Sequence, residues 1–187
     1  MSTPLSDEQI RAATIGEPNA VHGTILLVPY DPAWPAIFAN LARRIREALG
    51  SGVLLLEHVG STSVPGLTAK PIIDVLLAVK DSSDEAAYLP PLERAGFVLR
   101  IREPDWYQHR VLKGLQTRCN LHVFSAGCEE IGRMLRFRNR LRTHPKDRLE
   151  YERTKRALAT RTWKYVQNYA DAKSSVIEEI LARASAE

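Results

Sequence analysis

The chain has 187 residues and a mass of 21.0 kDa, with 44% hydrophobic and 26% charged residues, a balance typical of one soluble globular domain. Ten glycines and eleven prolines exclude a collagen-like or disordered chain, and no apolar run approaches the roughly 20 residues that a membrane span needs. The formal net charge is +4. The N-terminus has acids but no apolar signal-peptide core, which predicts a cytoplasmic location.

The first part of the chain begins with a capping box, Ser6-Asp7-Glu8-Gln9, which predicts a short helix. We therefore expect residues 1–20 to form a helical arm and residues 21–187 to form a single domain. Asp31 and Pro32 supply an N-cap and a first-turn proline for the next helix. The expected elements are a helix over 7–14, a strand over 23–29 and a helix over 32–49.

The middle of the chain is rich in short β-branched runs. The pattern predicts strands over 53–59 and 71–79, joined through a loop at 60–66; the second strand is apolar on both faces apart from Asp74, which is typical of a central strand. Ser82 and Ser83 are expected to cap a helix that ends at Ala95. Further strands are expected over 97–101, 106–113 and 120–124.

The last third has helical periodicity. Helices are expected over 129–142, 146–160 and 163–184. Together these elements predict an α/β (α+β) fold with one mixed sheet of five or six strands, helices packed on it, and the C-terminal helices over one edge or face. Cys119 and Cys128 lack the spacing of a zinc or redox motif, so we expect two small buried thiols.

Positive charge is concentrated between Arg133 and Lys164, where twelve Lys and Arg stand against Asp147, Glu150 and Glu152. Such a block favours a polyanionic partner, either a nucleotide phosphate or a nucleic acid. A solvated helix face is the alternative, because exposed charged faces are common.

The stretch that carries chemistry runs from Glu57 to Asp74: a strand, a Gly-Ser loop, a short connection and a strand with a buried acid. Gly60 allows a phosphate to approach closely, and the hydroxyls and backbone amides of residues 61–63 can bind its oxygens. Lys70 can add a positive charge. A carboxylate within an apolar strand needs a cation or hydrogen bonds, so Asp74 is either a site residue or a structural one.

Five motifs resemble the GrpB family. They are Pro29-Tyr-Asp-Pro-Ala-Trp34, His58-Val-Gly-Ser-Thr-Ser-Val-Pro-Gly-Leu67, Ala69-Lys-Pro-Ile-Ile-Asp74, Leu121-His-Val-Phe124 and Phe137-Arg-Asn-Arg-Leu-Arg-Thr-His-Pro145. The resemblance runs from about Val21 to the C-terminus. It implies the nucleotidyltransferase superfold of the DNA polymerase β type, and some relatives are fused to dephospho-CoA kinase.

By that resemblance, Gly60 and Ser61 match the phosphate-binding pair of the superfold, and Asp74 matches its first metal-binding, catalytic carboxylate. The second carboxylate is missing, because the corresponding position is Leu76. Two-metal transfer chemistry needs carboxylates that bridge the ions. The family's usual His-x-His and Arg-Asp are here Asn120-Leu-His122 and Arg138-Asn139, which removes two more candidate groups.

The candidate site therefore has two parts. Asp74, His58 and His122 could hold a divalent metal, with Mg²⁺ or Mn²⁺ implied by the superfold and Zn²⁺ possible for this ligand set. A structural role for both histidines is the alternative. The candidate phosphate-binding or nucleotide-binding residues are Gly60, Ser61, Thr62, Ser63, Lys70, Arg138, Lys155 and Lys173. Glu57 is expected to pair with a helix arginine, and Tyr30, Trp34 and Phe38 to pack in the core.

Three functions fit these residues. The first is metal-dependent transfer of a nucleotidyl or phosphoryl group to a small acceptor. The second is a binding module that holds a nucleotide or a coenzyme A precursor without turnover, which Leu76 favours. The third is RNA binding through the basic block, for which aromatic residues are sparse. The expected partner is a nucleotide or another phosphorylated small molecule, with nucleic acid less favoured and no membrane.

Overall fold

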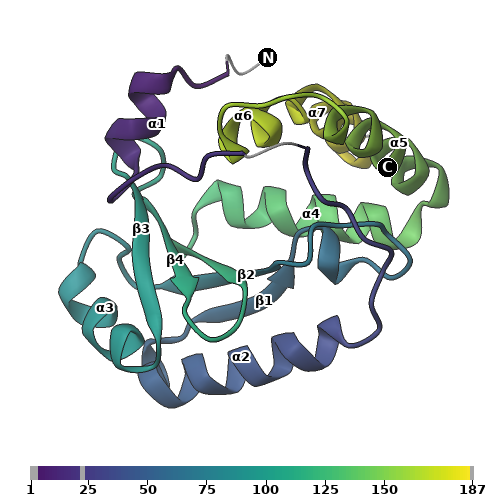
Figure 1. Ribbon diagram of the computed structural model, residues 1–187. Helices are drawn as coiled ribbons and strands as arrows, with labels where there is room; N and C mark the ends of the chain where they lie inside the picture. Colours follow the sequence, from purple (N-terminus) through teal and green to yellow (C-terminus); the bar gives the residue numbers. More distant parts are fainter. Residues whose placement is uncertain (1–3, 22–23, 186–187) are drawn as a thin grey trace.

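A computed structural model describes residues 4–21 and 24–185. A mixed sheet separates two layers of helices, with α2 and α3 on one face and α4 on the other, and α5, α6 and α7 lie beyond α4 (Figure 1). No helix in these ranges combines the length and the apolar character needed to cross a membrane. The mixed sheet with helices on both faces confirms the predicted mixed α/β architecture.

The sheet has five strands in the order β1-β2-β5-β4-β3. The β2 and β5 strands pair in parallel, and the other neighbours are antiparallel. This order makes β2 a central strand, as its apolar sequence predicts. The strands are β1 Leu55–Val59, β2 Ile73–Val79, β3 Phe97–Glu103, β4 His109–Gly114 and β5 Cys119–Ser125.

Seven α-helices surround the sheet in the described part of the chain. Their bounds are α1 Asp7–Ala13, α2 Trp34–Leu49, α3 Glu85–Arg94, α4 Glu129–Thr143, α5 Pro145–Ala159, α6 Val166–Asp171 and α7 Ser174–Ser185. Ser6 and Gln9 form the predicted capping box of α1. The N-terminal arm packs against the rest of the protein, because Ile10 is buried and Thr14 forms a β-bridge with Ile101 of β3.

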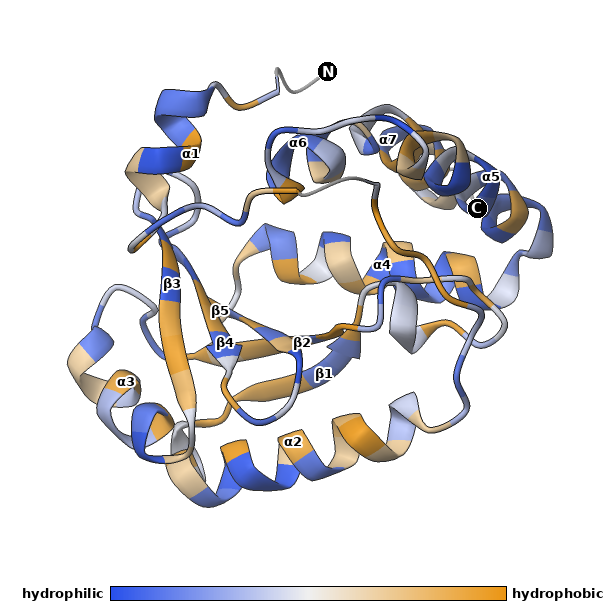
Figure 2. Ribbon diagram, viewed as in Figure 1, coloured by the Kyte–Doolittle hydropathy of each residue, from blue (hydrophilic) through white to orange (hydrophobic). Residues whose placement is uncertain are grey.

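Apolar side chains fill both faces of the sheet, and Figure 2 shows the hydrophobic strands between more hydrophilic helix surfaces. On one face Val75 and Leu77 pack with Leu41 and Ile45 of α2. On the other face Leu76 packs with Phe124 and Ile131 of α4 among other apolar groups. Because strand residues alternate between faces, Asp74 shares the α4 side with Leu76.

Three local predictions were wrong. The strand expected over 23–29 does not form: Gly23 lies outside the described residues, and the rest is irregular apart from a bridge between Val28 and Ala69. The second helix begins at Trp34 rather than at Pro32, because the Asp31 carboxylate accepts a hydrogen bond from the Ala33 amide in a turn. The N-cap position of the third helix is Asp84 rather than a serine, and its side chain makes no capping hydrogen bond.

The predicted helix over 163–184 is two helices, α6 and α7. Tyr169 of α6 packs with Ile25 and Leu158, whereas Val176 and Ile180 of α7 pack in a different apolar cluster. A single straight helix could not place the apolar residues of both segments in these two separate clusters. The break between them places Lys173 at the junction, which matters for the site described next.

Candidate functional site

The loop between β1 and β2 is built around Gly60. Its φ is +68°, a left-handed conformation that favours glycine, and a short 3₁₀ turn over Ser61–Ser63 follows it. A Cβ atom on Gly60 would lie 2.3 Å from Asp74 Oδ2. From the sequence we expected a phosphate to approach the backbone here. In the structure, the Asp74 carboxylate lies against Gly60 instead.

Asp74 is held by polar groups of the neighbouring strand. Asn120 Nδ2 donates a hydrogen bond to Asp74 Oδ1 at 2.6 Å, His122 Nε2 lies 3.7 Å from the same oxygen, and Lys113 Nζ donates to Asn120 Oδ1. Burial alone would raise the pKa of Asp74, but the neighbouring His122, the hydrogen bond from Asn120 and the charge of Lys70 outweigh it and lower the pKa. The carboxylate is therefore ionised at neutral pH.

Four lysines interact electrostatically with Asp74, and we call them the lysine cluster: Lys70, Lys113, Lys155 and Lys173. Lys155 is 2% exposed, and its Nζ donates to Ser61 Oγ at 2.9 Å and to the carbonyl of Thr68. Burial, with the nearby charge of Lys173, lowers the pKa of Lys155 to about 7 and that of Lys70 to about 8. Burial also lowers the pKa of Lys113 and Lys173.

Two tyrosines complete the cluster. The Lys155 ammonium lies 5.1 Å from the ring centroid of Tyr151, and Lys70 and Lys173 lie 5.6 and 4.7 Å from that of Tyr169, within the range of cation–π attraction. The Tyr169 hydroxyl is buried and has no hydrogen-bond partner among the described residues. Neither tyrosine was among the expected site residues, because their helical spacing is the same as that of core residues.

The charges of this site do not balance. Asp74 is the carboxylate that acts on all four lysines. Glu152 also acts on Lys155 and Asp171 on Lys173, but Glu152 accepts hydrogen bonds from Thr68 and Arg156 and Asp171 accepts them from Gln167 and the Leu5 amide. Desolvated cations that outnumber their carboxylate partners favour an added anion, because it would restore the charged form of each lysine. The geometry can therefore bind an anionic group beside Ser61.

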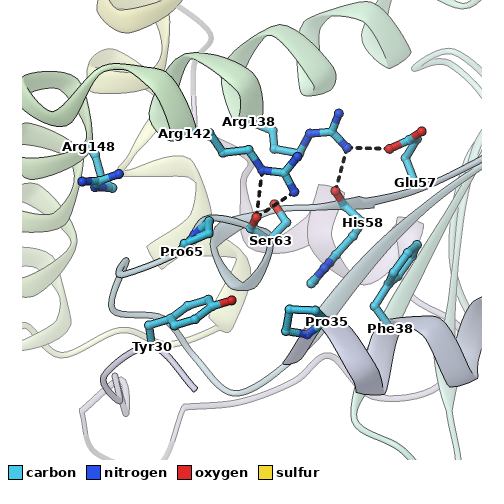
Figure 3. A pocket seen from close by; sticks show the side chains of 10 residues that line it. All are labelled: Tyr30, Pro35, Phe38, Glu57, His58, Ser63, Pro65, Arg138, Arg142 and Arg148. Atoms are coloured by element: carbon cyan, nitrogen blue, oxygen red, sulfur yellow. Dashed lines mark hydrogen bonds and ion pairs between the residues drawn. The ribbon is translucent and has the colours of Figure 1, made fainter. Parts of the chain in front are cut away.

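The structure brings together Ser61, Lys70, Asp74, Lys155 and Lys173 of the predicted site and adds Lys113, Asn120, Tyr151 and Tyr169. The hydroxyls of Thr62 and Ser63 serve the loop itself: Thr62 contacts His58 Nε2, and Ser63 donates to the carbonyl of Gly60. Arg138 lies elsewhere, at the outer edge of β1, where it pairs with Glu57 at 2.7 Å (Figure 3). The predicted pairing of Glu57 with a helix arginine is confirmed.

The predicted three-residue metal group is not brought together. His58 faces α2, where its ring stacks on Phe38 at 4.8 Å, whereas His122 lies on the α4 side with Asp74 and contacts His109 at 3.1 Å. Within residues 4–21 and 24–185, no group of three or more His, Cys, Asp or Glu is arranged to hold a metal. Leu76 is fully buried in an apolar cluster. This donor set does not fit a two-metal centre.

Most of the basic block is used inside the protein. Seven of its twelve cations contact carboxylates, hydroxyls or carbonyls of the chain, so the block is not one continuous surface of unpaired cations. Those seven are Arg133, Arg138, Arg140, Arg142, Lys155, Arg156 and Lys164.

Cys119 is buried as expected, whereas Cys128 is only half-buried. Trp34 lies in the core, and Tyr30 and Phe38 pack against it with part of their surface exposed.

Comparison with known proteins gives a consistent result. A family model described as GrpB protein matches residues 24–183. A UPF0157 protein of Halalkalibacterium halodurans is 57% identical over 185 residues, covering 99% of this chain and 95% of that protein. The crystal structure of conserved protein GrpB from Enterococcus faecalis superimposes with a TM-score of 0.72 at 32% identity, covering 84% of this chain and 98% of that one. A dephospho-CoA kinase of Mycolicibacterium paratuberculosis is 37% identical over 76 residues, which cover 39% of this chain and 19% of the kinase.

Proposed function

The chain belongs to the GrpB family, and we propose that it binds a phosphorylated small molecule, a nucleotide or a coenzyme A precursor, at the lysine cluster. The observation that carries this proposal is an imbalance of charge: the buried Lys155, which donates to the Ser61 hydroxyl, and three half-buried lysines all interact with the charge of Asp74. A phosphate group has the charge to pair with several of them at once.

Two further observations support a phosphorylated ligand. The Tyr169 hydroxyl has no hydrogen-bond partner among the described residues and can donate to a phosphate oxygen, and Lys70 and Lys173 lie over the ring of the same residue. The partial similarity to a dephospho-CoA kinase favours a ligand of the coenzyme A type. Placement in the nucleotidyltransferase superfold, with Gly60 and Ser61 as its phosphate-binding pair, is part of the same proposal.

Metal-dependent transfer of a nucleotidyl or phosphoryl group is the second candidate. It is favoured by the ionised Asp74, which stands directly against the Gly60 loop. It ranks below binding because Leu76 occupies the position of the second carboxylate in the core and because the lysines would repel a dication. A requirement for Mg²⁺, Mn²⁺ or Zn²⁺ stays a prediction.

Calorimetric titration of wild type with pyrophosphate, ATP and dephospho-CoA tests the binding proposal. We expect at least one of them to bind and Lys155→Met to weaken it by about tenfold or more, equal to about 1.4 kcal/mol. Lys146→Met is the matched control, because Lys146 is exposed on the same helix. Failure of all three ligands to bind, or equal affinity in wild type and Lys155→Met, would refute the proposal.

Turnover separates the two candidates. Wild type and Asp74→Asn are incubated with ATP, dephospho-CoA and Mg²⁺ or Mn²⁺, and released pyrophosphate and ADP are measured. Under the binding proposal neither product forms above the rate without protein. Metal-dependent release by wild type that Asp74→Asn lacks would favour the transfer function.

A further inference from the structure

A cavity lies along the outer edge of β1, between the N-terminal half of α2 and helices α4 and α5 (Figure 3). Its volume is about 550 Å³, within the range of about 300–1,000 Å³ that small-molecule sites have. None of its lining residues belongs to the lysine cluster. Its walls include Tyr30, Phe38, His58, Arg138, Arg142 and Arg148, and we call it the arginine cavity.

The arginine cavity carries uncompensated positive charge. Arg138 is paired with Glu57, which is the carboxylate in the wall. Arg142 donates from Nε and Nη2 to the carbonyl of Ser63 at 2.9 and 2.8 Å, contacts that fix the guanidinium without neutralising it. Among the described residues, no ion pair or side-chain hydrogen bond involves Arg148, and in Figure 3 no dashed line joins it to the other lining residues.

The opposite wall of the cavity is aromatic. The Phe38 and His58 rings stack 8° from parallel, and Tyr30 stands edge-on to Trp34. Burial and the charges of Arg142 and Arg138 outweigh the nearby Asp74 and lower the pKa of His58 to about 4, so its imidazole is neutral at pH 7. The flat, uncharged rings on this wall suit a planar ring in the ligand.

We propose that the arginine cavity binds a small molecule that carries an anionic group on a planar ring. Arg148 and the remaining donors of Arg142 would bind the anion, because a guanidinium matches carboxylate, phosphate or sulfonate oxygens. Tyr30 and Phe38 would contact the ring. This site is separate from the lysine cluster, and one loop serves both: Ser61 contacts Lys155, and the carbonyl of Ser63 contacts Arg142. The protein therefore has two anion sites, one on each side of a shared turn.

Anilinonaphthalene sulfonate is the probe, because it joins a sulfonate to aromatic rings and its fluorescence reports binding. The neutral phenylnaphthylamine, which lacks the sulfonate, is the matched ligand. We expect wild type to bind the sulfonate at a single site and Arg148→Gln to bind it about tenfold more weakly. Arg153→Gln, an exposed arginine on the same helix, is expected to bind like wild type.

Four further measurements define the site. Tyr30→Leu is expected to weaken binding of the sulfonate, and phenylnaphthylamine is expected not to distinguish wild type from Arg148→Gln. Lys155→Met is expected to bind the sulfonate like wild type, and saturating pyrophosphate is expected not to displace it. The unfolding midpoint of each variant confirms that it folds.

Equal affinity of wild type and Arg148→Gln for the sulfonate, or its displacement by pyrophosphate, would overturn the second site. Neither result depends on whether the lysine cluster binds its own ligand, because the variants and probes of the two sites are different.

Discussion

Two groups of cations, one between the C-terminal helices and one around Asp74, differ in how many carboxylates face them. In the first group Arg140 and Arg183 both bind Asp147, and Arg183 also binds Glu150 at 2.7 Å. Carboxylates face these arginines, which join α4, α5 and α7. We call this group the arginine network.

In the second group, the lysine cluster, four lysines share Asp74, and burial lowers the pKa of each. A cation that is paired with carboxylates helps to hold the helices together. A buried cation without enough carboxylate partners destabilises the fold unless a bound ligand compensates its charge. The comparison teaches that a run of positive charge in the sequence can combine structural and ligand-binding residues. Burial and partners distinguish them.

The largest expected effect comes from breaking the arginine network. Asp147→Asn removes the carboxylate that Arg140 and Arg183 bind, and both Asp147 and Arg140 are less than 10% exposed at their side chains. We expect a loss of about 3 kcal/mol in the free energy of unfolding, since breaking a buried pair leaves its cation poorly compensated. Urea unfolding measures it.

Glu47→Gln is the control for that experiment. Its partner Arg43 and Glu47 itself are about 60% exposed, so the loss is expected to stay below about 0.5 kcal/mol. Equal losses in the two variants would contradict the distinction between buried and exposed pairs.

Gly60→Ala tests whether the position of the Asp74 carboxylate depends on the absence of a side chain at residue 60. The new methyl group would clash with the Asp74 carboxylate, and we expect the variant to lose about 2 kcal/mol more stability than Gly66→Ala. Gly66 also has positive φ, but no atom lies within 4 Å of its added Cβ, so it isolates the backbone strain. Chemical unfolding of both variants measures the difference; identical losses would show that Asp74 does not need this glycine.

Removing one lysine from the cluster should change how stability depends on pH. The pKa of Lys155 is about 7 in the folded protein and 10.5 in the unfolded chain. Between these values the unfolded state binds more protons, so the free energy of unfolding rises with pH, by at most about 1.4 kcal/mol per pH unit for one group. We expect the free energy of unfolding of Lys155→Met to rise less steeply than that of wild type between pH 7 and 10, because Lys70 still contributes, and that of Lys146→Met to rise as in wild type. Parallel curves for wild type and Lys155→Met would contradict the lowered pKa.

The smallest expected effect is proton uptake on binding. An anion at the lysine cluster raises the pKa of Lys155 toward its ordinary value, so pyrophosphate binding at pH 8 should take up as much as about one proton. The measurement is calorimetry in two buffers of different ionisation enthalpy. At pH 6 the lysine is already protonated, and the uptake should disappear; uptake that is the same at both values would assign the proton to another group.

The local part of this molecule could be predicted well from sequence. The capping box of α1, the apolar β2 strand and the periodic helices α4 and α5 depend on neighbours within a few residues. The Gly60 loop and Asp74 were also recognisable, because a glycine-serine turn and an acid in an apolar strand are unusual locally. The helix break at Lys173 was not predictable, since it depends on which apolar clusters Tyr169 and Val176 reach.

The sequence by itself determined the α/β class, the family resemblance and the position of Ser61, Lys70 and Asp74 on one loop and strand, because short-range periodicity and turn chemistry specify these features. Only the tertiary structure decided which cations remain without a full complement of carboxylates. It directed His58 to α2 and Arg138 to Glu57, and it gathered Lys155 and Lys173 around Asp74. Pairing and desolvation depend on distances between segments far apart in the chain, and sequence spacing does not encode those distances.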